Sequence, residues 1–175
     1  LQSFILNASD YGIPQNRRRF FLIGTNKKIF DQDIKLDFTD YMSKSYTIGD
    51  AIKDLEVVPV TTNIADSPTK YKNLSIPKQN DYLKRIANSN LIYNHLVTET
   101  SEIVLKRFKN LKPGQNFHDL PAELKNTYTN SSRTQNTIYQ RLDYNSVSGT
   151  VVNVRKSMWI HPNLDRSISV REAAR

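Results

Sequence analysis

The stretch YGIPQNRRRFFLIG, Tyr11 to Gly24, decides how the chain begins, because it places three arginines directly before an apolar run. The apolar run predicts a short strand over Arg19–Gly24, and a second strand is predicted over Leu1–Ala8. The residues between them include Gly12 and Pro14, which are turn formers. We therefore expect two neighbouring strands joined by a turn that carries the arginine run.

The arginine run is either a solvated basic turn or a functional surface. In an extended segment the side chains alternate, so Gln15, Arg17 and Arg19 project to one side and Asn16 and Arg18 to the other. One face then holds an amide and two guanidiniums. Guanidinium is planar and permanently charged, which suits it to bind phosphate oxygens or a carbonyl oxygen that gains negative charge.

The composition favours a polyanionic partner. The 175 residues include 25 Lys and Arg against 17 Asp and Glu, which gives a net charge of +8, and the pI is about 9.6. Nucleic acid is the leading candidate, although many basic proteins bind no polyanion. The chain has no cysteine, which excludes disulfides, thiolate metal ligands and a cysteine nucleophile within it. No apolar run approaches the roughly 20 residues that span a bilayer.

Periodicity predicts further elements along the chain. Thr47 can cap a helix and Asp50 suits its first turn. Asn126 to Thr137 is a polar stretch, and it separates the helical region from two predicted strands. The predicted helices are 47–55, 81–88 and 101–111, and the predicted strands are 138–142 and 147–154.

The end of the chain carries a helix start. Ser169 and Glu172 form the Ser-x-x-Glu pattern of a capping box. Too few residues follow the cap for a helix that is stable by itself. Since the strand at Leu1 also starts without a lead-in, the sequence predicts an excised part of a larger protein. Arg171 and Arg175 share a face of the new helix and are expected to hold it to the missing domain.

Two segments resemble one known family. LNASDYGIPQNRRRFFLIG, residues 6–24, resembles the Gln-x-Arg-x-Arg segment of DNA cytosine-5 methyltransferases, with its preceding Tyr-Gly-x-Pro. RLDYNSVSGTVVNV and IHPNLDRSISVREAAR are similar to the segment that follows those enzymes' target recognition domain and leads back into the catalytic domain. The two matches stand in the order that the family requires and cover roughly 1–24 and 138–175.

The resemblance implies a reaction and roles for three residues. In that family a cysteine attacks carbon 6 of a flipped cytosine, and carbon 5 takes a methyl group from S-adenosylmethionine. Arg19 would donate to the 2-oxo group of the cytosine as the ring gains charge. Arg17 would support the nucleophile loop and a nearby phosphate, and Gln15 would fill space around the extruded base.

The chain departs from the family in lacking its Pro-Cys loop, Glu-Asn-Val segment and glycine-rich cofactor loop, all of which lie upstream of the arginine segment. The fragment is therefore expected to be inactive alone. S-adenosylmethionine would bind the full-length enzyme, and none is expected on this fragment.

The expected fold is α+β, with an antiparallel strand pair from the edge of the catalytic domain and a small, loop-rich target recognition domain of short strands and helices. Residues 1–40 are expected to be a remnant of the catalytic domain, 41–160 the target recognition domain, and 161–175 the start of the segment that returns to the catalytic domain.

The polar stretch is the leading candidate to read DNA. Arginine, glutamine and asparagine can make the bidentate contacts that distinguish guanine and adenine in the major groove. The side chains expected to do so are Arg133, Gln135 and Asn136; a flexible loop without base contacts is the alternative. A second recognition loop, whose residues could equally contact phosphate, is expected to contain Arg141, Asn153, Arg155 and Lys156.

The expected partners are double-stranded DNA and the rest of the catalytic domain, in a bacterial cytoplasm, without a membrane. No metal site is expected, because His95, His118 and His161 lie far apart in sequence without companions at ligand spacing. Two alternatives stay open. One is a fragment of a transfer-RNA cytosine-5 methyltransferase, and the other is a stand-alone, non-catalytic nucleic-acid-binding module.

Overall fold

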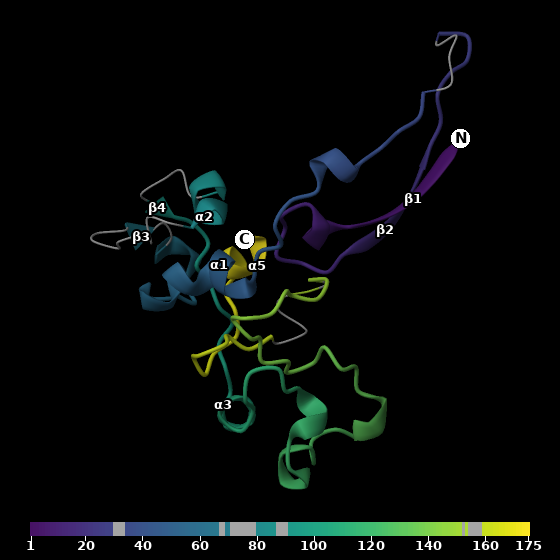
Figure 1. Cartoon of the computed structure of the whole chain (residues 1–175). Helices are drawn as coiled ribbons and strands as arrows, with labels where there is room; N and C mark the ends of the chain where they lie inside the picture. Colours follow the sequence, from purple (N-terminus) through teal and green to yellow (C-terminus); the bar gives the residue numbers. More distant parts are fainter. Residues whose placement is uncertain (30–33, 67–68, 71–79, 87–90, 152, 154–158) are drawn as a thin grey trace.

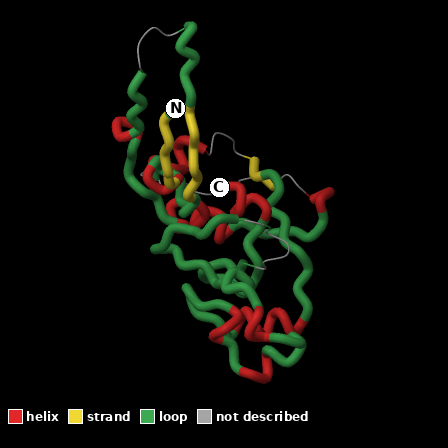
Figure 2. Tube along the Cα trace, turned by 90° about the vertical axis from the view of Figure 1, so that its right-hand side faces the viewer, coloured by secondary structure: helices red, strands yellow, loops and turns green. Residues whose placement is uncertain are grey.

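The chain folds as short helices and antiparallel strand pairs joined by long loops, which is an α+β fold (Figures 1 and 2). The structure is a computed structural model, and it describes residues 1–29, 34–66, 69–70, 80–86, 91–151, 153 and 159–175. None of the helices in these ranges has the length and apolar character that crossing a bilayer requires.

The first two strands form a hairpin that projects from the rest of the molecule (Figure 1). Strands β1 (Gln2–Asn7) and β2 (Arg18–Ile23) are antiparallel. Their register runs from the Gln2–Ile23 pair to the Asn7–Arg18 pair. The prediction of two neighbouring strands around the arginine turn is therefore confirmed, with β2 starting one residue earlier than predicted.

The two faces of the hairpin have different surroundings. On one face Phe4 packs edge-to-face against Phe38, with ring centroids 5.0 Å apart. On the other face Ile5, Phe20 and Leu22 are 63%, 66% and 60% exposed. Ile5 and Phe20 are direct cross-strand partners, so this face is a continuous apolar surface in contact with solvent.

The central core forms around helix α1 (Ile48–Ile52), which continues as a 3₁₀ turn over Lys53–Val57. Thr47 and Asp50 form a capping box at its start, which confirms the predicted cap. Helices α2 (Asp81–Ile86) and α5 (Val170–Ala174) lie beside it. The buried apolar residues of this core are Ile48, Ala51, Ile52, Tyr82, Leu142, Trp159 and Ile168.

A second core lies under helix α3 (Glu102–Lys109), where short 3₁₀ turns replace regular elements (Figure 2). Those turns span Phe117–Asp119, Ala122–Leu124 and Ser131–Arg133. The second core consists of Phe108, Leu111, Phe117, Leu120, Leu124, Tyr139 and Ile160.

A separate small sheet pairs β3 (Thr69–Lys70) with β4 (Leu91–Ile92) in antiparallel orientation.

The prediction of strands at 138–142 and 147–154 is wrong for the described residues. Tyr139 has a φ of +53°, which no strand residue adopts. Arg141 and Ser148 instead form isolated bridges, with Ile160 and Gln15 respectively. The segments pair residue by residue with distant parts of the chain, which local alternation of apolar residues does not reveal.

The C-terminal helix is fixed by the predicted cap. The Ser169 hydroxyl accepts from the Glu172 amide, and the Glu172 carboxylate accepts from the Ser169 amide. Arg171 donates to the Tyr93 carbonyl, and Arg175 pairs with Asp54 at 2.6 Å. Both arginines thus bind this chain itself. The boundary predicted after residue 160 passes through the core that joins α1 to Ile168.

Candidate functional site

The turn before the arginine run has a fixed shape. Gly12 has a φ of +77°, and a Cβ atom built on it would lie 2.6 Å from the Ser43 hydroxyl oxygen. Tyr11 forms a parallel bridge with Ser43 at the same place. Pro14, two residues after Gly12, is also buried. Glycine is therefore required at position 12 by both backbone conformation and space.

The three arginines follow this turn and are exposed. The Arg17 amide donates to the Asn7 side-chain oxygen at 2.8 Å, which ties the run to the end of β1. Arg18 pairs with Asn7 and Arg19 with Leu6 in the hairpin, so the two side chains leave opposite faces of the sheet. A terminal nitrogen of Arg19 donates to the Arg18 carbonyl. All three guanidiniums are accessible to a ligand.

A distant segment binds the backbone of the arginine turn. The Ser148 amide donates to the Pro14 carbonyl at 3.0 Å, and the Asn16 amide donates to the Ser148 carbonyl at 2.7 Å. The Thr150 hydroxyl donates to the Asn16 carbonyl at 3.1 Å. The structure thus brings together the two parts of the sequence that carry the resemblance.

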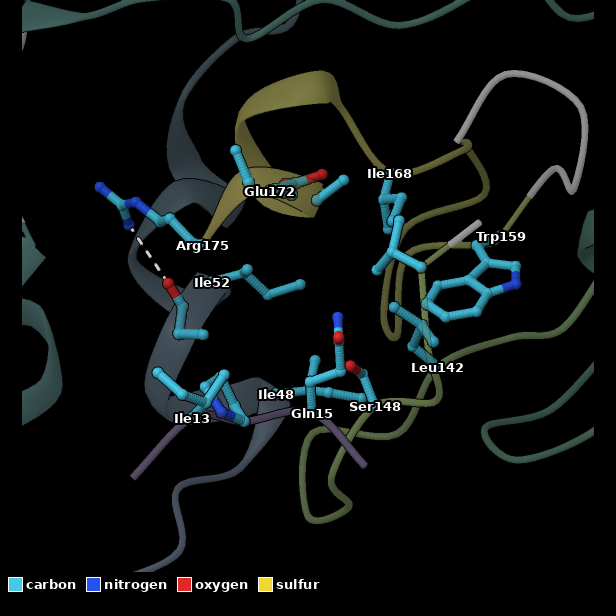
Figure 3. Close-up of a pocket in the computed structure, with 15 residues that line it drawn as sticks. Ile13, Gln15, Ile48, Ile52, Leu142, Ser148, Trp159, Ile168, Glu172 and Arg175 are labelled. Carbon is cyan, nitrogen blue, oxygen red and sulfur yellow. Dashed lines mark hydrogen bonds between the residues drawn. The ribbon is translucent and has the colours of Figure 1, made fainter. Parts of the chain in front are cut away.

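A cavity of about 160 Å³ lies beside this junction (Figure 3). Its wall is apolar where α1 and Trp159 line it, and Gln15 and Ser148 supply polar groups at one side. The Gln15 amide points into the cavity (Figure 3). On the opposite side Arg175 donates to the Ala51 carbonyl. Gln15 is therefore the predicted site residue that faces inward, whereas Arg17 and Arg19 face solvent.

Helix α5, which borders the cavity, is held by a buried ion pair between Arg166 and Glu172. Arg166 donates to both oxygens of Glu172, at 2.7 and 2.8 Å. Burial alone would raise the pKa of Glu172, but the hydrogen bonds and charge of Arg166 outweigh it and place that pKa below its usual value. The Glu172 carboxylate therefore stays ionised inside the protein.

His161 lies fully buried beside Glu172. Its Nδ1 accepts from the Asn163 and Leu164 amides, so the ring is neutral with its proton on Nε2. Burial, partly opposed by the charge of Glu172, lowers the pKa of His161 to about 4. These contacts give His161 a structural role. Among the described residues, no three acidic or histidine side chains gather as metal ligands.

Four of the residues expected to read DNA lie on the surface. Arg133, Gln135 and Asn136 are exposed on one loop. Asn153 is exposed on the 147–153 segment. The remaining two, Arg155 and Lys156, lie outside the described residues.

Arg141 occupies the interior, contrary to its expected place on a recognition loop. It is 5% exposed, and its terminal nitrogens donate to the carbonyls of Phe108, His161 and Leu164 and to the Asp165 carboxylate. A guanidinium engaged in this way is not available to a base or a phosphate. We therefore assign Arg141 a structural role, joining α3 to the 161–165 turn.

Comparison with known proteins decides the class. The family model for C-5 cytosine-specific DNA methylase matches residues 1–175. The chain belongs to the C-5 cytosine-specific DNA methylase family. The resemblance found in the two terminal segments is thereby confirmed, and the match also covers the middle, where no resemblance was evident.

Relatives of the methylase family match nearly all of this chain. It is 29% identical to the type II methyltransferase M.DdeI of Desulfomicrobium norvegicum, over 98% of this chain and 42% of that protein. It is 28% identical to the DNA (cytosine-5)-methyltransferase 1A of Oryza sativa subsp. japonica, over 98% of this chain and 14% of that protein. The chain therefore spans less than half the length of these relatives.

A solved structure has a similar fold. It is the crystal structure of a putative DNA modification methyltransferase encoded within a prophage (E. coli), and it matches with a TM-score of 0.67 and 26% identity. The match covers 99% of this chain and 48% of that one. The fold of this methylase-family chain is thus one that a DNA methyltransferase structure contains.

Sequence reasoning missed the residues that support the arginine turn. Ser148 and Thr150 contact that turn, but neither residue stands out by type or spacing. The signal available was the alternation that predicted a strand over 147–154. Alternation indicates an extended backbone without naming the partner, and here the partner is the turn at Pro14–Asn16.

Proposed function

We propose that this chain is part of an enzyme that transfers a methyl group from S-adenosylmethionine to carbon 5 of a flipped cytosine in a specific sequence of double-stranded DNA. The chain supplies the active-site arginines and the recognition of the target. The match of the family model to all of residues 1–175 carries this proposal. The junction between the arginine turn and the 147–151 segment supports it, because it fixes the backbone that presents the arginines.

The catalytic contribution of the chain is electrostatic. Arg19 donates to the 2-oxo group of the extruded cytosine and stabilises the charge that the ring gains during attack. Its guanidinium is exposed and engaged with its neighbour's carbonyl, an interaction that a ligand oxygen can replace. Arg17 contacts phosphate and the loop that carries the nucleophile. Gln15, whose side chain lines the cavity, occupies space beside the extruded base.

The nucleophile and the cofactor site come from polypeptide outside this chain. There is no cysteine in the 175 residues. The five glycines, at positions 12, 24, 49, 114 and 149, are too scattered to form a loop that closely approaches a cofactor. The residues present thus do not fit an S-adenosylmethionine site. Residues 1–175 alone should therefore be inactive.

The exposed face of the hairpin is the contact with the rest of the catalytic domain. Ile5, Phe20 and Leu22 form an apolar surface of a kind that proteins bury against a partner. The matched relatives are more than twice as long as the part that this chain covers in them, with shares of 42% and less. Residues 1–40 then belong to the catalytic domain, 41–160 to the target recognition domain, and 161–175 lead back.

Recognition of DNA is assigned to exposed polar residues. Arg133, Gln135 and Asn136 contact bases, since these side chain types make bidentate contacts with guanine and adenine. Asn153, Arg155 and Lys156 supply the DNA contacts of the second recognition loop. The net charge of +8 supports binding to the phosphate backbone.

The test is methyl transfer by the full-length protein that the gene encodes. With labelled S-adenosylmethionine and DNA of mixed sequence, the label should enter cytosine in duplex DNA and not in transfer RNA. Residues 1–175 alone should transfer none. Labelling of transfer RNA alone would favour the RNA-modifying type. DNA binding without methyl transfer by the full-length protein would favour a non-catalytic binding module.

A further inference from the structure

The loop proposed to read bases, residues 126–137, has both of its ends bound to one buried side chain. Arg107, on α3, is 3% exposed. Its Nε donates to the Leu124 carbonyl at 2.8 Å, and one terminal nitrogen donates to the Thr127 hydroxyl. The other terminal nitrogen donates to the Tyr139 hydroxyl at 3.1 Å. A single guanidinium therefore joins the chain just before the loop to the chain just after it.

Aromatic rings complete the surroundings of this guanidinium. Its central carbon lies 5.2 Å from the ring centroid of Tyr128 and 5.3 Å from that of Tyr139. Phe117 packs against both tyrosines, with centroids 4.5 and 6.1 Å away. Within the described residues the guanidinium makes no ion pair with a carboxylate. The buried cation therefore depends on π faces and neutral acceptors that the loop ends provide.

The backbone at the second anchor is strained. Tyr139 is 1% exposed and has a φ of +53°, a conformation that a bulky residue keeps only when its surroundings hold it. The hydrogen bond from Arg107 and the ring contacts supply that restraint. A hydrogen bond also fixes the middle of the loop, where a His118 ring nitrogen lies 2.9 Å from the Thr134 carbonyl oxygen. The exposed residues Arg133, Gln135 and Asn136 lie within two positions of Thr134 in the sequence.

We propose that Arg107 is a positioning residue for target recognition: it holds the two ends of the 126–137 loop at a fixed spacing and so sets how strictly the loop discriminates between bases. This inference rests on the proposed function. Base discrimination requires side chains that stay in one geometry, because bidentate hydrogen bonds lose strength when their donors are displaced. A loop with one free end would still carry the same polar residues without holding them in register.

The variant that separates anchoring from charge is Arg107→Lys. Lysine keeps the positive charge, but its compact ammonium lacks the planar fork that reaches three acceptors at once. The matched control is Leu55→Ala, which opens a cavity in a different cluster of buried residues, around Val58 and Ile92. Both variants should lower the midpoint of thermal unfolding, so loss of stability alone does not distinguish them.

The first measurement is hydrogen exchange of the loop amides under native conditions, in the full-length protein. Arg107→Lys should raise the exchange rate of the amides in residues 126–139 by about ten-fold. In this variant the loop can open without first breaking the hydrogen bonds that Arg107 makes to its ends. Leu55→Ala should leave exchange in that segment near the wild-type rate. Thr127→Val, which removes one of the acceptors, should give an intermediate increase.

The second measurement is the set of cytosines that the full-length protein methylates in a DNA library of mixed sequence. Wild type should favour one target over sequences that differ by one base. Arg107→Lys should reduce that preference by about ten-fold, and Leu55→Ala should keep it.

Unchanged exchange and an unchanged preference in Arg107→Lys would overturn the inference, as would an equal loss of preference in Leu55→Ala. Wild-type protein that methylates no DNA would refute the proposed function and the reading role together. In that case the exchange measurement would still decide whether Arg107 anchors the loop.

Discussion

The backbone of Ser148 lies alongside Gln15 and hydrogen-bonds to the residues on both sides of it. The Ser148 amide donates to the Pro14 carbonyl at 3.0 Å, and its carbonyl accepts from the Asn16 amide at 2.7 Å. Arg17 follows directly. The position of the arginines relative to the 147–151 segment is therefore set by backbone groups, which side-chain substitutions leave in place.

Replacing Ser148 by proline should uncouple the two segments. Proline has no amide hydrogen, so Ser148→Pro loses the bond to the Pro14 carbonyl. Ser148→Ala keeps the backbone bonds and is the matched control. We expect Ser148→Pro to reduce methyl transfer by the full-length protein at least ten-fold, since small displacements of catalytic groups are costly. Equal activity of the two variants would contradict the coupling.

The exposed arginines offer a test in which each variant removes the same charge. Arg19→Ala should reduce methyl transfer about 10²- to 10³-fold, the usual effect of losing a donor to a developing oxyanion. Arg18→Ala should cause a much smaller loss, because Arg18 leaves the opposite face of β2, the Ile5 and Phe20 face that is proposed to contact the catalytic domain and not the cytosine. Both side chains are exposed, so thermal unfolding should be nearly unchanged in each. Comparable losses in both variants would point to general phosphate binding.

Alanine substitutions at Gly12 and Gly114 distinguish the cost of backbone strain from the cost of a steric clash. Both have positive φ, +77° and +84°. A Cβ atom at Gly12 would lie 2.6 Å from the Ser43 hydroxyl oxygen, whereas nothing lies within 4 Å at Gly114. Gly114→Ala should cost about 1 kcal/mol of unfolding free energy from strain alone. Gly12→Ala should cost more, and it should also lower methyl transfer because the turn carries the arginines. Equal destabilisation in urea unfolding would show that Ser43 moves aside freely.

The sequence predicted those parts of the fold whose causes are local. The helix cap at Thr47 and the capping box at Ser169 were visible as residue patterns, because each involves residues close together in sequence; that Thr47 and Asp50 also form a capping box was seen only in the structure. The hairpin was visible because an apolar run follows a Gly and Pro turn. The strands expected at 138–142 and 147–154 were wrong, because the pairing of those residues is with distant single residues.

Burial explains why site residues were harder to predict than elements. Three arginines have sequence neighbours of polar or mixed character, namely Arg107, Arg133 and Arg141, yet only Arg133 is exposed. The difference depends on which carbonyls converge on each guanidinium, and those carbonyls lie up to 33 residues away, as with Arg141 and Phe108. A single sequence does not show such convergence. The polar stretch itself was correctly placed as an exposed loop because its composition is local information.

Acid should destabilise the chain well above the pH at which its carboxylates titrate. Burial lowers the pKa of His161 from 6.5 to about 4 and also lowers the pKa of His95. Between pH 6.5 and pH 4 His161 binds a proton in the unfolded chain but not in the folded chain, so the free energy of unfolding falls as the pH falls. For His161 the difference corresponds to roughly 3 kcal/mol by pH 4. Urea unfolding at pH 7, 6 and 5 should show a progressive loss.

The variant His161→Asn isolates this contribution. An asparagine oxygen can accept from the Asn163 and Leu164 amides, as Nδ1 does, without titrating. The variant should be less stable at pH 7, yet it should lose less stability between pH 7 and 5 than wild type, with His95 accounting for the remaining slope. The lowered pKa of Glu172 adds a loss only below about pH 4.5, outside this window. An unchanged slope in His161→Asn would mean that His161 is protonated in the folded state, against the two amides that donate to it.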